Sequence, residues 1–505
     1  MRTWTVADAT DGRLHREGFT IDERRAMPAA SGEAGSGRQE HSDLAVEPGS
    51  YRDRNGAVFY RDGRILRGVS AKALRNWERL AGCGFFRDRT ADGTIVPTER
   101  VSDPPPEIGA GWAAVLEHQR IPFISYPYEW TFGMLKDAAL LHLELMREAL
   151  AEGMILKDSS AYNVQWNGAK PAFIDVPSFE ILPDGQPWIG YRQFCELFLY
   201  PLMLQAYKGV EFRSWLSGSI DGIPAEGLRP LMSVLDLVRP GALLHVVAQN
   251  ALQRRYSKRT ATVGGSLAQA GFRKELILRN VEGLKKIVTR LSPAGVRTEW
   301  ADYDRTHSYD DDEFAAKRAF VGAAAAHRRW RLVWDLGCNT GTFSRIAGEH
   351  ADYVVSMDGD WMAIESLYRA QQSRPDRHKI LPLVVDLSDP SPSQGWRGLE
   401  RKSLPERGRP ELTLCLALVH HIVIGANIPL ADFLAWLAGL GTSLIIEFVG
   451  RDDEMVQTLL RNKDDQYDDY RPEIFEAELA RRFEIRDRRP LKGGKREIFF
   501  ALARR

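Results

Sequence analysis

Residues 333–341 read Val-Trp-Asp-Leu-Gly-Cys-Asn-Thr-Gly, and this stretch decides the fold of the chain. An apolar run ends in Asp335, and Gly337 and Gly341 predict a tight turn before a helix that begins near Thr342. Glycine has no Cβ, so the backbone can approach a ligand closely, and Asn339 tolerates left-handed turn geometry better than most residues. A strand, a glycine-containing loop and a helix in this order are typical of a nucleotide site at the carboxyl ends of parallel strands.

Further apolar runs follow at the spacing of an α/β sheet. The second run ends in Asp358, about one βα unit after Asp335, where a carboxylate can accept both ribose hydroxyls. The third run ends in Asp386, and the fourth is expected to end in His420 and His421. The strands predicted after the first are 352–358, 381–386, 412–421, 443–447, 483–485 and 497–502, the last two as a closing pair.

This ordered set resembles the class I S-adenosylmethionine-dependent methyltransferases over roughly residues 310–505. The closing pair looks like the antiparallel hairpin that marks their sheet, whereas a Rossmann dehydrogenase would more often show Gly-x-Gly-x-x-Gly. The resemblance implies a Rossmann-like α/β domain and S-adenosylmethionine as the cofactor. The cofactor-binding residues that it implies are Asp335, Gly337, Cys338, Asn339 and Gly341 in the first loop, Asp358 at the ribose, Trp361 as a wall for adenine, and Asp386 with Leu387 at the adenine amino group.

Two histidines are the candidate catalytic residues. A hydroxyl acceptor must lose its proton as it is methylated, and histidine is suited to that task near neutral pH. If His420 and His421 end a strand, alternation sends their side chains in different directions, so at most one is expected to face the acceptor. The alternative is that either is a packed, hydrogen-bonded histidine. Leu418-Val-His-His421 also differs from the Asn/Asp-Pro-Pro-Tyr/Phe motif of enzymes that methylate amide or exocyclic nitrogens, so we expect a small hydroxylated or glycan-like acceptor.

Composition restricts the class of protein. The chain has 505 residues, enough for roughly two to four domains. Its 68 basic and 68 acidic residues give a net charge of zero, so the overall charge of the chain does not favour nucleic acid as a partner. Four cysteines without a Cys-x-x-Cys pair indicate neither a disulfide framework nor a zinc knuckle. No stretch is apolar enough for a signal peptide or a membrane span, so we expect a cytoplasmic enzyme with a small-molecule substrate; the oligomeric state is left open.

The first 300 residues have a different organisation. Polar composition predicts a mobile tail over 1–50, and an Asp62-Gly63 turn predicts a hairpin over 57–67. Ser70 can cap a helix that ends near Leu80, a long helix is expected over 132–152, and 191–292 are mainly helical. The basic stretch 254–286 is interpreted as a solvated helix face rather than an RNA-binding patch. The predicted division is a tail over 1–50, a small α+β lobe over 51–130, a helical lobe over 131–295 and the cofactor-binding domain over 296–505.

A second constellation lies at residues 158–175. Asp158 and Asn163 have the Asp-x-x-x-x-Asn spacing, and Asp175 ends a short apolar run after an Asn-Gly turn. Three such side chains can hold Mg²⁺ and orient a hydroxyl. The arrangement resembles the protein-kinase-like and small-molecule phosphotransferase fold over about 51–290, which implies Asp158 as base, Asn163 and Asp175 as metal ligands, and Mg-ATP as a second cofactor.

The same region departs from that family's pattern. Leu156 stands where a histidine is usual, Val176-Pro177 follows Asp175, and no Gly-x-Gly-x-x-Gly loop occurs between 51 and 130. Arg67 or Lys72 is the candidate substitute for the ATP-clamping lysine. Two interpretations therefore remain open: an active phosphotransferase, or a kinase-like scaffold that has lost phosphotransfer and contributes substrate contacts.

Overall fold

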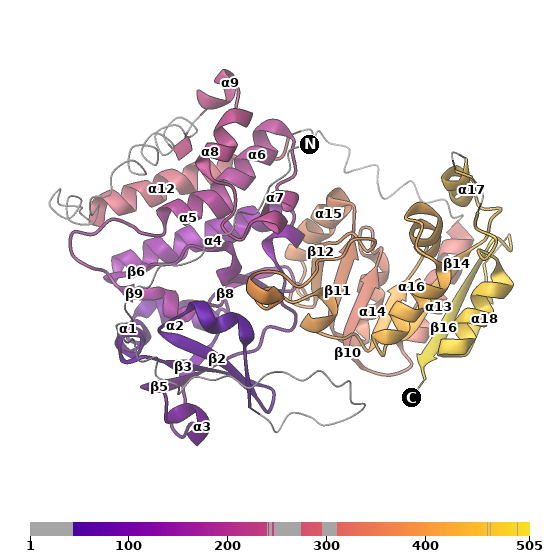
Figure 1. Ribbon diagram of the computed structural model, residues 1–505, viewed down its shortest axis with the longest axis horizontal. Coiled ribbons are helices and arrows are strands. Elements are labelled where there is room, and N and C mark those ends of the chain that lie inside the picture. Colours follow the sequence, from indigo (N-terminus) through magenta and orange to yellow (C-terminus); the bar gives the residue numbers. More distant parts are fainter. Residues whose placement is uncertain are drawn as a thin grey trace, which may run out of the picture. The chain divides into compact units, whose positions relative to one another are not determined.

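A seven-stranded sheet carries the glycine loop (Figure 1). The computed structural model describes residues 44–239, 241, 245–246, 274–294, 311–461, 463–464, 466–491 and 493–504. The strand order in this sheet is β12-β11-β10-β13-β14-β16-β15, which places the first strand, β10, near the centre. The strands are β10 (Trp330–Leu336), β11 (Ala351–Asp358), β12 (Ile380–Val384), β13 (Leu412–Cys415), β14 (Ser443–Val449), β15 (Phe483–Pro490) and β16 (Arg496–Ala503).

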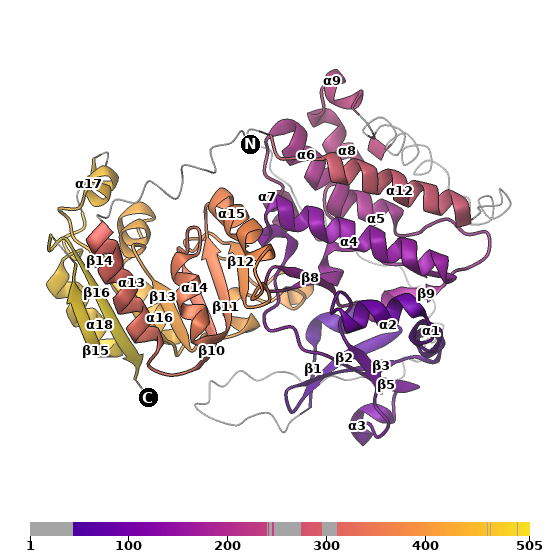
Figure 2. The same cartoon turned by 180° about the vertical axis from the view of Figure 1, so that it is seen from behind.

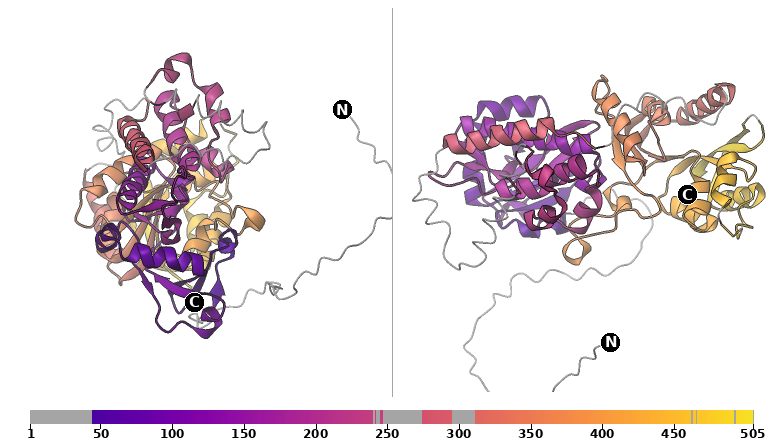
Figure 3. Two further views of the ribbon diagram at one scale, coloured as in Figure 1. Left: turned by 90° about the vertical axis from the view of Figure 1, so that its left-hand side faces the viewer. Right: turned by 90° about the horizontal axis from the view of Figure 1, so that it is seen from above.

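Six strands of this sheet run in the same direction, and β16 runs in the opposite one. β16 pairs antiparallel with β14, and β15 pairs antiparallel with β16, so this closing pair, in yellow, forms one edge (Figure 3). At the opposite edge β12 contains Pro382, which lacks an N–H and is tolerated in an edge strand. The sequence-based expectation of a closing antiparallel pair is confirmed.

Helices cover both faces of the large sheet. Successive residues of a strand point to opposite faces. Val333 and Val354 pack on the side of α13 (Asp311–Ala325) and α14 (Thr342–Glu349), whereas Trp334 and Val355 pack on the side of α16 (Leu430–Gly439) and α18 (Pro472–Arg482). This two-sided burial explains why the strands read as continuous apolar runs rather than as alternating ones. The remaining helices of this half are α15 (Trp361–Gln372) and α17 (Glu454–Leu460).

The N-terminal part begins with a smaller sheet in the order β1-β2-β3-β5-β4. Asp62 and Gly63 adopt positive φ and connect β2 to β3, which confirms the hairpin. Ser70 accepts a hydrogen bond from the Ala73 amide and begins α1, also as expected. The elements are β1 (Ala45–Val46), β2 (Gly56–Arg61), β3 (Arg64–Val69), α1 (Ala71–Ala81), α2 (Gly84–Ala91), β4 (Thr98–Arg100), α3 (Pro106–Gly109) and β5 (Ala114–His118).

A helical part follows, built on the predicted long helix α4 (Phe132–Ala151), which packs beside α12 (Lys274–Arg290; Figure 2). Two short antiparallel strand pairs flank the second constellation: β6 (Met154–Leu156) pairs with β9 (Phe179–Ile181), and β7 (Val164–Asn167) forms a hairpin with β8 (Lys170–Phe173). The other helices are α5 (Tyr191–Phe194), a π-helical turn (Cys195–Leu199), α6 (Tyr200–Lys208), α7 (Arg213–Gly218), α8 (Ala225–Leu228) and α9 (Val234–Leu237).

The structure differs from the sequence-based prediction in where some segments begin and end. The predicted tail does not extend to residue 50, because β1 and a 3₁₀ turn (Pro48–Arg52) form there and β1 pairs with β2. Most of the basic stretch 254–286 lies outside the described residues, as do the tail residues 1–43. Within α12, Lys285 pairs with Glu144. Among the described residues, none of the helices has both the length and the apolar composition needed to cross a bilayer.

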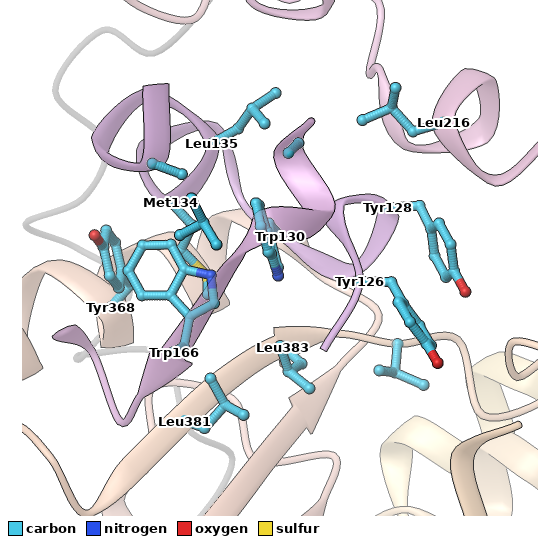
Figure 4. Close-up of a cluster of buried hydrophobic side chains, with 14 of the residues drawn as sticks. Tyr126, Tyr128, Trp130, Met134, Leu135, Trp166, Leu216, Tyr368, Leu381 and Leu383 are labelled. Atoms are coloured by element: carbon cyan, nitrogen blue, oxygen red, sulfur yellow. The ribbon is translucent and has the colours of Figure 1, made fainter. Parts of the chain in front are cut away.

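One apolar core joins the N-terminal elements to the large sheet. Trp130 and Trp166 meet edge to face, and Trp166 meets Tyr368 of α15 in the same way. Figure 4 shows these rings beside Leu381 and Leu383 of β12. Trp130, Trp166 and Tyr368 are all completely buried. The cofactor-binding half is therefore packed against residues that lie about 200 positions earlier in the chain.

Candidate cofactor and acceptor site

The loop after β10 has the left-handed geometry that its sequence predicts. Gly337, Asn339 and Gly341 have φ values of 71°, 48° and 78°, a region that favours glycine and, next to it, asparagine. The amides of Gly337 and Cys338 both donate to the Met357 carbonyl, at 2.8 and 3.0 Å, which ties the loop to β11. Gly341 then begins α14.

The reason for one glycine differs from the expectation. A Cβ on Gly341 would lie 2.5 Å from Leu367 Cδ1 of α15, and a Cβ on Gly337 would lie 3.2 Å from Leu418 Cδ1. The close approach at Gly341 is therefore to a neighbouring helix. The loop sequence predicted the turn, but it carried no information about this contact partner.

Asp358 ends β11 beside the loop. Its Oδ2 accepts a hydrogen bond from the Asn339 amide at 2.8 Å, and its Oδ1 accepts one from the Asp360 amide at 2.9 Å. Each carboxylate oxygen retains a further lone pair for a ligand hydroxyl. Burial raises the pKa of Asp358, and these two backbone hydrogen bonds oppose the rise.

Asp335 lies on the same face of the sheet as Asp358. It pairs in register with Ser356, two residues before Asp358, and cross-strand partners share a face. The Asp335 carboxylate is 1% exposed and accepts a hydrogen bond from Ser344 Oγ at 2.5 Å. Burial raises its pKa to about 7; the Ser344 hydrogen bond opposes this shift and the nearby Asp358 charge adds to it.

An apolar surface adjoins the two carboxylates. Cys338, Ile364, Leu367 and Val384 form one cluster, and Trp361, the first residue of α15, packs against it. This is the position predicted for an adenine wall. Asp386 and Leu387 follow β12 at the same edge; Asp386 is exposed, and its Oδ1 accepts hydrogen bonds from the amide and hydroxyl of Ser388.

The two histidines do not end a strand, and this expectation was wrong. β13 stops at Cys415, Ala417 turns the chain with φ 51°, and His421 begins a π-helical turn that ends at Gly425. The alanine turn breaks the ladder, so strand alternation does not decide where His420 and His421 point. Their ring centroids are 4.2 Å apart.

The environments of the histidines differ. His420 is 2% exposed, and its Nδ1 has no hydrogen-bond partner within the described part of the chain. Burial lowers its pKa to about 3, and the adjacent His421 acts in the same direction. His421 is exposed, and its pKa is lowered by burial of the ring and raised by the charge of Asp358. Of the two histidines, His421 is therefore the one whose pKa responds to the Asp358 charge and whose side chain is exposed.

A buried ion-pair network beside His420 was missed at the level of sequence. Lys317 of α13 pairs with Glu447 of β14 at 2.6 Å, with side chains 2% and 0% exposed, and Arg496 pairs with Asp453 at 2.8 Å. A signal was present, because Lys317 lies at helical spacing in the buried stripe with Val321 and Ala324. A charge in such a stripe indicates a buried partner.

The three residues of the second constellation, Asp158, Asn163 and Asp175, lie close together in the fold. Burial raises the pKa of Asp158 and the charge of Asp175 adds to the rise, whereas hydrogen bonds from the Ser160 amide, Gln193 and Asn163 oppose it. Asn163 Nδ2 lies 3.4 Å from Ser178 Oγ. Asp175 Oδ1 accepts from Arg67 Nη1 of β3 at 2.6 Å, so the guanidinium neutralises the predicted metal ligand. No group of three or more His, Cys, Asp or Glu side chains in the described ranges is arranged to hold a metal ion.

The residues after β10, β11 and β12 fit S-adenosylmethionine. The half-buried carboxylate of Asp358, with free lone pairs, suits the ribose, and the apolar cluster with Trp361 suits a purine ring. With the mostly parallel sheet, the central glycine loop and the reversed strand β16, these features are those of the class I S-adenosylmethionine-dependent methyltransferases, and the chain is an enzyme of that class.

Comparison with known proteins places the chain in a particular family. It belongs to the family of nodulation protein NoeA: the NoeA protein of Rhizobium meliloti (strain 1021) is 34% identical over 463 residues, which cover 89% of this chain and 94% of that protein. No family model matches the chain.

Solved methyltransferase structures align with less than half of the chain. N-methyltransferase NodS from Bradyrhizobium japonicum WM9 covers 39% of this chain and 99% of its own length, with a TM-score of 0.27 and 9% identity. The magnesium protoporphyrin IX methyltransferase ChlM from Synechocystis PCC 6803 covers 41% and 93%, with a TM-score of 0.28 and 15% identity. Similarities this distant give no information about the acceptor.

Proposed function

We propose that this chain transfers the methyl group of S-adenosylmethionine to a hydroxyl of a small hydroxylated or glycan-like molecule. The observation that carries the proposal is Asp358, a half-buried carboxylate at the end of β11 whose two oxygens accept hydrogen bonds from the Asn339 and Asp360 amides and keep lone pairs for a ligand. The proposal assigns the ribose to Asp358, the adenine ring to Trp361 and its cluster, and the methionine end to the loop from Asp335 to Gly341.

His421 is the proposed base. The bound cofactor supplies a methyl group on a sulfonium sulfur, which keeps the bonding electron pair when the methyl group leaves. A hydroxyl acceptor then has one proton to lose, and a neutral imidazole can take it up. Within the described residues neither ring nitrogen of His421 has a hydrogen-bond partner, and its lowered pKa keeps the ring neutral at pH 7. His420, with a pKa of about 3, would hold a proton too weakly for this role.

Calorimetry with S-adenosylmethionine tests the cofactor assignment. We expect Asp358→Ala to weaken binding at least about tenfold, because it removes a hydrogen-bonded carboxylate from the site. Asp352→Ala is the matched control, because Asp352 lies on the same strand, β11, and is exposed. Equal affinity of Asp358→Ala and the wild type would overturn the proposal.

The acceptor requires a separate experiment. Cells with and without the protein are fed methionine labelled in its methyl group, and their metabolites are compared. A labelled product that is absent with His421→Ala and present with His420→Gln supports O-methylation with His421 as the base. A labelled product methylated on nitrogen would contradict the proposed acceptor.

ATP-dependent phosphotransfer is the second candidate function. One observation favours it: Asp158, Asn163 and Asp175 interact electrostatically or by hydrogen bonding. The Arg67 guanidinium beside Asp175 weighs against it, because it supplies the charge that Mg²⁺ would otherwise supply. Calorimetry with Mg-ATP tests this second function. Binding of Mg-ATP that is lost in Asp175→Ala would support phosphotransfer, and no binding to the wild type would exclude it.

A further inference from the structure

A cavity of about 570 Å³ opens beyond the π-helical turn that follows β13. Its lining comes from two segments of the chain: one follows β13 and the other follows α17 after β14. The lining residues are Val423, Asn427, Ile428 and Pro429 in the first segment, and Lys463, Asp464, Gln466, Tyr467 and Asp469 in the second. The carboxyl ends of parallel strands meet at one edge of a sheet, so both segments lie at the edge that carries the glycine loop and Asp358. The volume is in the range of small-molecule sites.

The two walls of this cavity are bonded to each other. Lys463 donates to the Gly425 carbonyl and to Asn427 Oδ1, at 3.0 Å each, and also to the Ile424 carbonyl. The Tyr467 hydroxyl donates to Asn427 Oδ1 and to the Ile424 carbonyl. These hydrogen bonds hold the two walls together and fix the charge of Lys463 in the wall of the cavity.

Three other polar side chains that line the cavity are available to bind a ligand. Within the described part of the chain, the side chains of Asp464, Gln466 and Asp469 have no hydrogen-bond or ion-pair partner, and all three are exposed. Together they offer five acceptor oxygens and one amide donor group. A ligand that fits must bring several donors and at least one acceptor.

We infer that this cavity binds the acceptor of the methyl-transfer reaction, and that the acceptor is an uncharged, hydroxyl-rich molecule of the sugar or polyol class. A hydroxyl both donates and accepts, so it satisfies the two carboxylates and the Gln466 amide together. A polyamine brings donors only, leaves the amide N–H groups unmet and meets the fixed charge of Lys463. An apolar ligand would desolvate Asp464 and Asp469 without compensation.

The π-helical turn connects this cavity to the reaction site. His421 begins the turn near Asp358, and Val423, two residues later, lines the cavity. π-helical turns are frequent at functional sites. The inference rests on the proposed methyl transfer and adds to it the chemical class of the acceptor and the residues that recognise it.

Saturation-transfer NMR on the full chain tests the inference with cellobiose and myo-inositol as hydroxyl-rich probes and spermidine as a cationic probe. We expect at least one hydroxyl-rich probe to bind, and its signal to fall at least about fivefold in Asp464→Ala/Asp469→Ala. Asp468→Ala is the matched control, because Asp468 is 96% exposed in the same segment, does not line the cavity and pairs with Arg471. Calorimetry with S-adenosylmethionine is run on each variant in parallel.

The outcomes separate the two proposals. Cofactor binding without binding of either hydroxyl-rich probe, or an equal signal in the double variant and the control, overturns the acceptor cavity and leaves methyl transfer standing. Spermidine binding in preference to both overturns the sugar or polyol class. Probe binding without cofactor binding overturns methyl transfer, and the acceptor role of the cavity with it.

Discussion

At the residue scale, Asp335 has a pKa well above the usual value for an aspartate. Its carboxyl is buried between β10 and α14 and is hydrogen-bonded to Ser344, and its pKa is raised to about 7. In an unfolded chain the same group has a pKa of about 3.9. The folded protein therefore holds a proton on Asp335 over a pH range in which the unfolded chain has already lost it.

This difference gives the stability a pH dependence of known sign. Between about pH 4 and pH 7 the folded state binds more protons at Asp335, so the free energy of unfolding falls as pH rises, and the contribution is constant above about pH 7. We expect Asp335→Asn to gain stability relative to the wild type from pH 5 to pH 8, by on the order of 1–3 kcal/mol. Urea unfolding at four pH values measures this, with Asp352→Asn as the exposed control; a pH-independent difference would contradict it.

Gly341 ends the loop after β10 in a left-handed backbone conformation that favours glycine. Its φ is 78°, and the side chain of Leu367 occupies the space that a Cβ would need, so an alanine there is strained and also displaces this buried leucine. We expect Gly341→Ala to lower the free energy of unfolding by about 2–4 kcal/mol. Gly439→Ala in α16 is the control: its Cβ meets open space, and it should be neutral or slightly stabilising. Equal effects of the two variants in thermal unfolding would disprove this explanation.

At the scale of elements, α4 packs against α15, the helix that begins beside the proposed cofactor site. Asp137 of α4 accepts hydrogen bonds from the Tyr368 hydroxyl at 2.7 Å and from Gln372 Nε2 at 2.9 Å. The Gly133 amide donates to Glu365 Oε2 at 2.8 Å. Because α15 also carries Leu367 of the apolar cluster and Trp361, which packs against that cluster, this contact connects the N-terminal half to the proposed cofactor site.

Removal of Asp137 tests this contact. In Asp137→Ala the Tyr368 hydroxyl loses its acceptor, so we expect the free energy of unfolding to fall by about 1–3 kcal/mol. The affinity for S-adenosylmethionine should also fall, because α15 is less firmly held. Chemical unfolding and calorimetry measure the two effects, and Asp389→Ala in the exposed loop after β12 serves as the control. Unchanged stability would show that α15 is held by its apolar contacts alone.

At the scale of the whole molecule, the long connection between β12 and β13 fastens the sheet to the N-terminal half. Arg407 forms a two-pronged ion pair with Glu129, at 2.7 Å for both hydrogen bonds, with side chains 1% and 2% exposed. In the same connection Arg401 donates to the Tyr162 hydroxyl at 3.1 Å, and the Lys402 amide donates to the Tyr126 hydroxyl at 2.6 Å. Tyr162 is the neighbour of Asn163, so this connection also reaches the second constellation.

Loss of one partner in the Arg407–Glu129 pair should be severe. Arg407→Met leaves a buried carboxylate unpaired, and we expect a loss of about 3–5 kcal/mol, whereas Arg407→Met/Glu129→Met should recover most of it. The exposed pair of Arg64 and Glu117 is the control, and Arg64→Met should cost less than about 1 kcal/mol. Calorimetric unfolding measures all three, and an effect of Arg407→Met no larger than that of Arg64→Met would refute the role of the pair.

Local patterns in the sequence were sufficient to predict much of the structure of the methyltransferase domain. The left-handed loop, the acids at the carboxyl ends of β10 and β11, the closing antiparallel pair and the long helix α4 all follow from local signals, because turn geometry and apolar periodicity are local properties. The position of the histidines did not follow, because an alanine at φ 51° ends β13 and alanine is not a turn signal. The kinase-like resemblance of 51–290, the four-part domain division and the roles of the site residues stay predictions.

The sequence by itself determined that a carboxylate and a glycine loop meet at the edge of a parallel sheet, since neighbouring strands of a βαβ unit bring their carboxyl ends together. Only the tertiary structure decided which charges are buried and with which partners. Lys317 with Glu447, Arg67 with Asp175 and Arg407 with Glu129 are 130, 108 and 278 residues apart. Pairs so distant depend on how whole elements pack, and side-chain periodicity within one element contains no information about the partner.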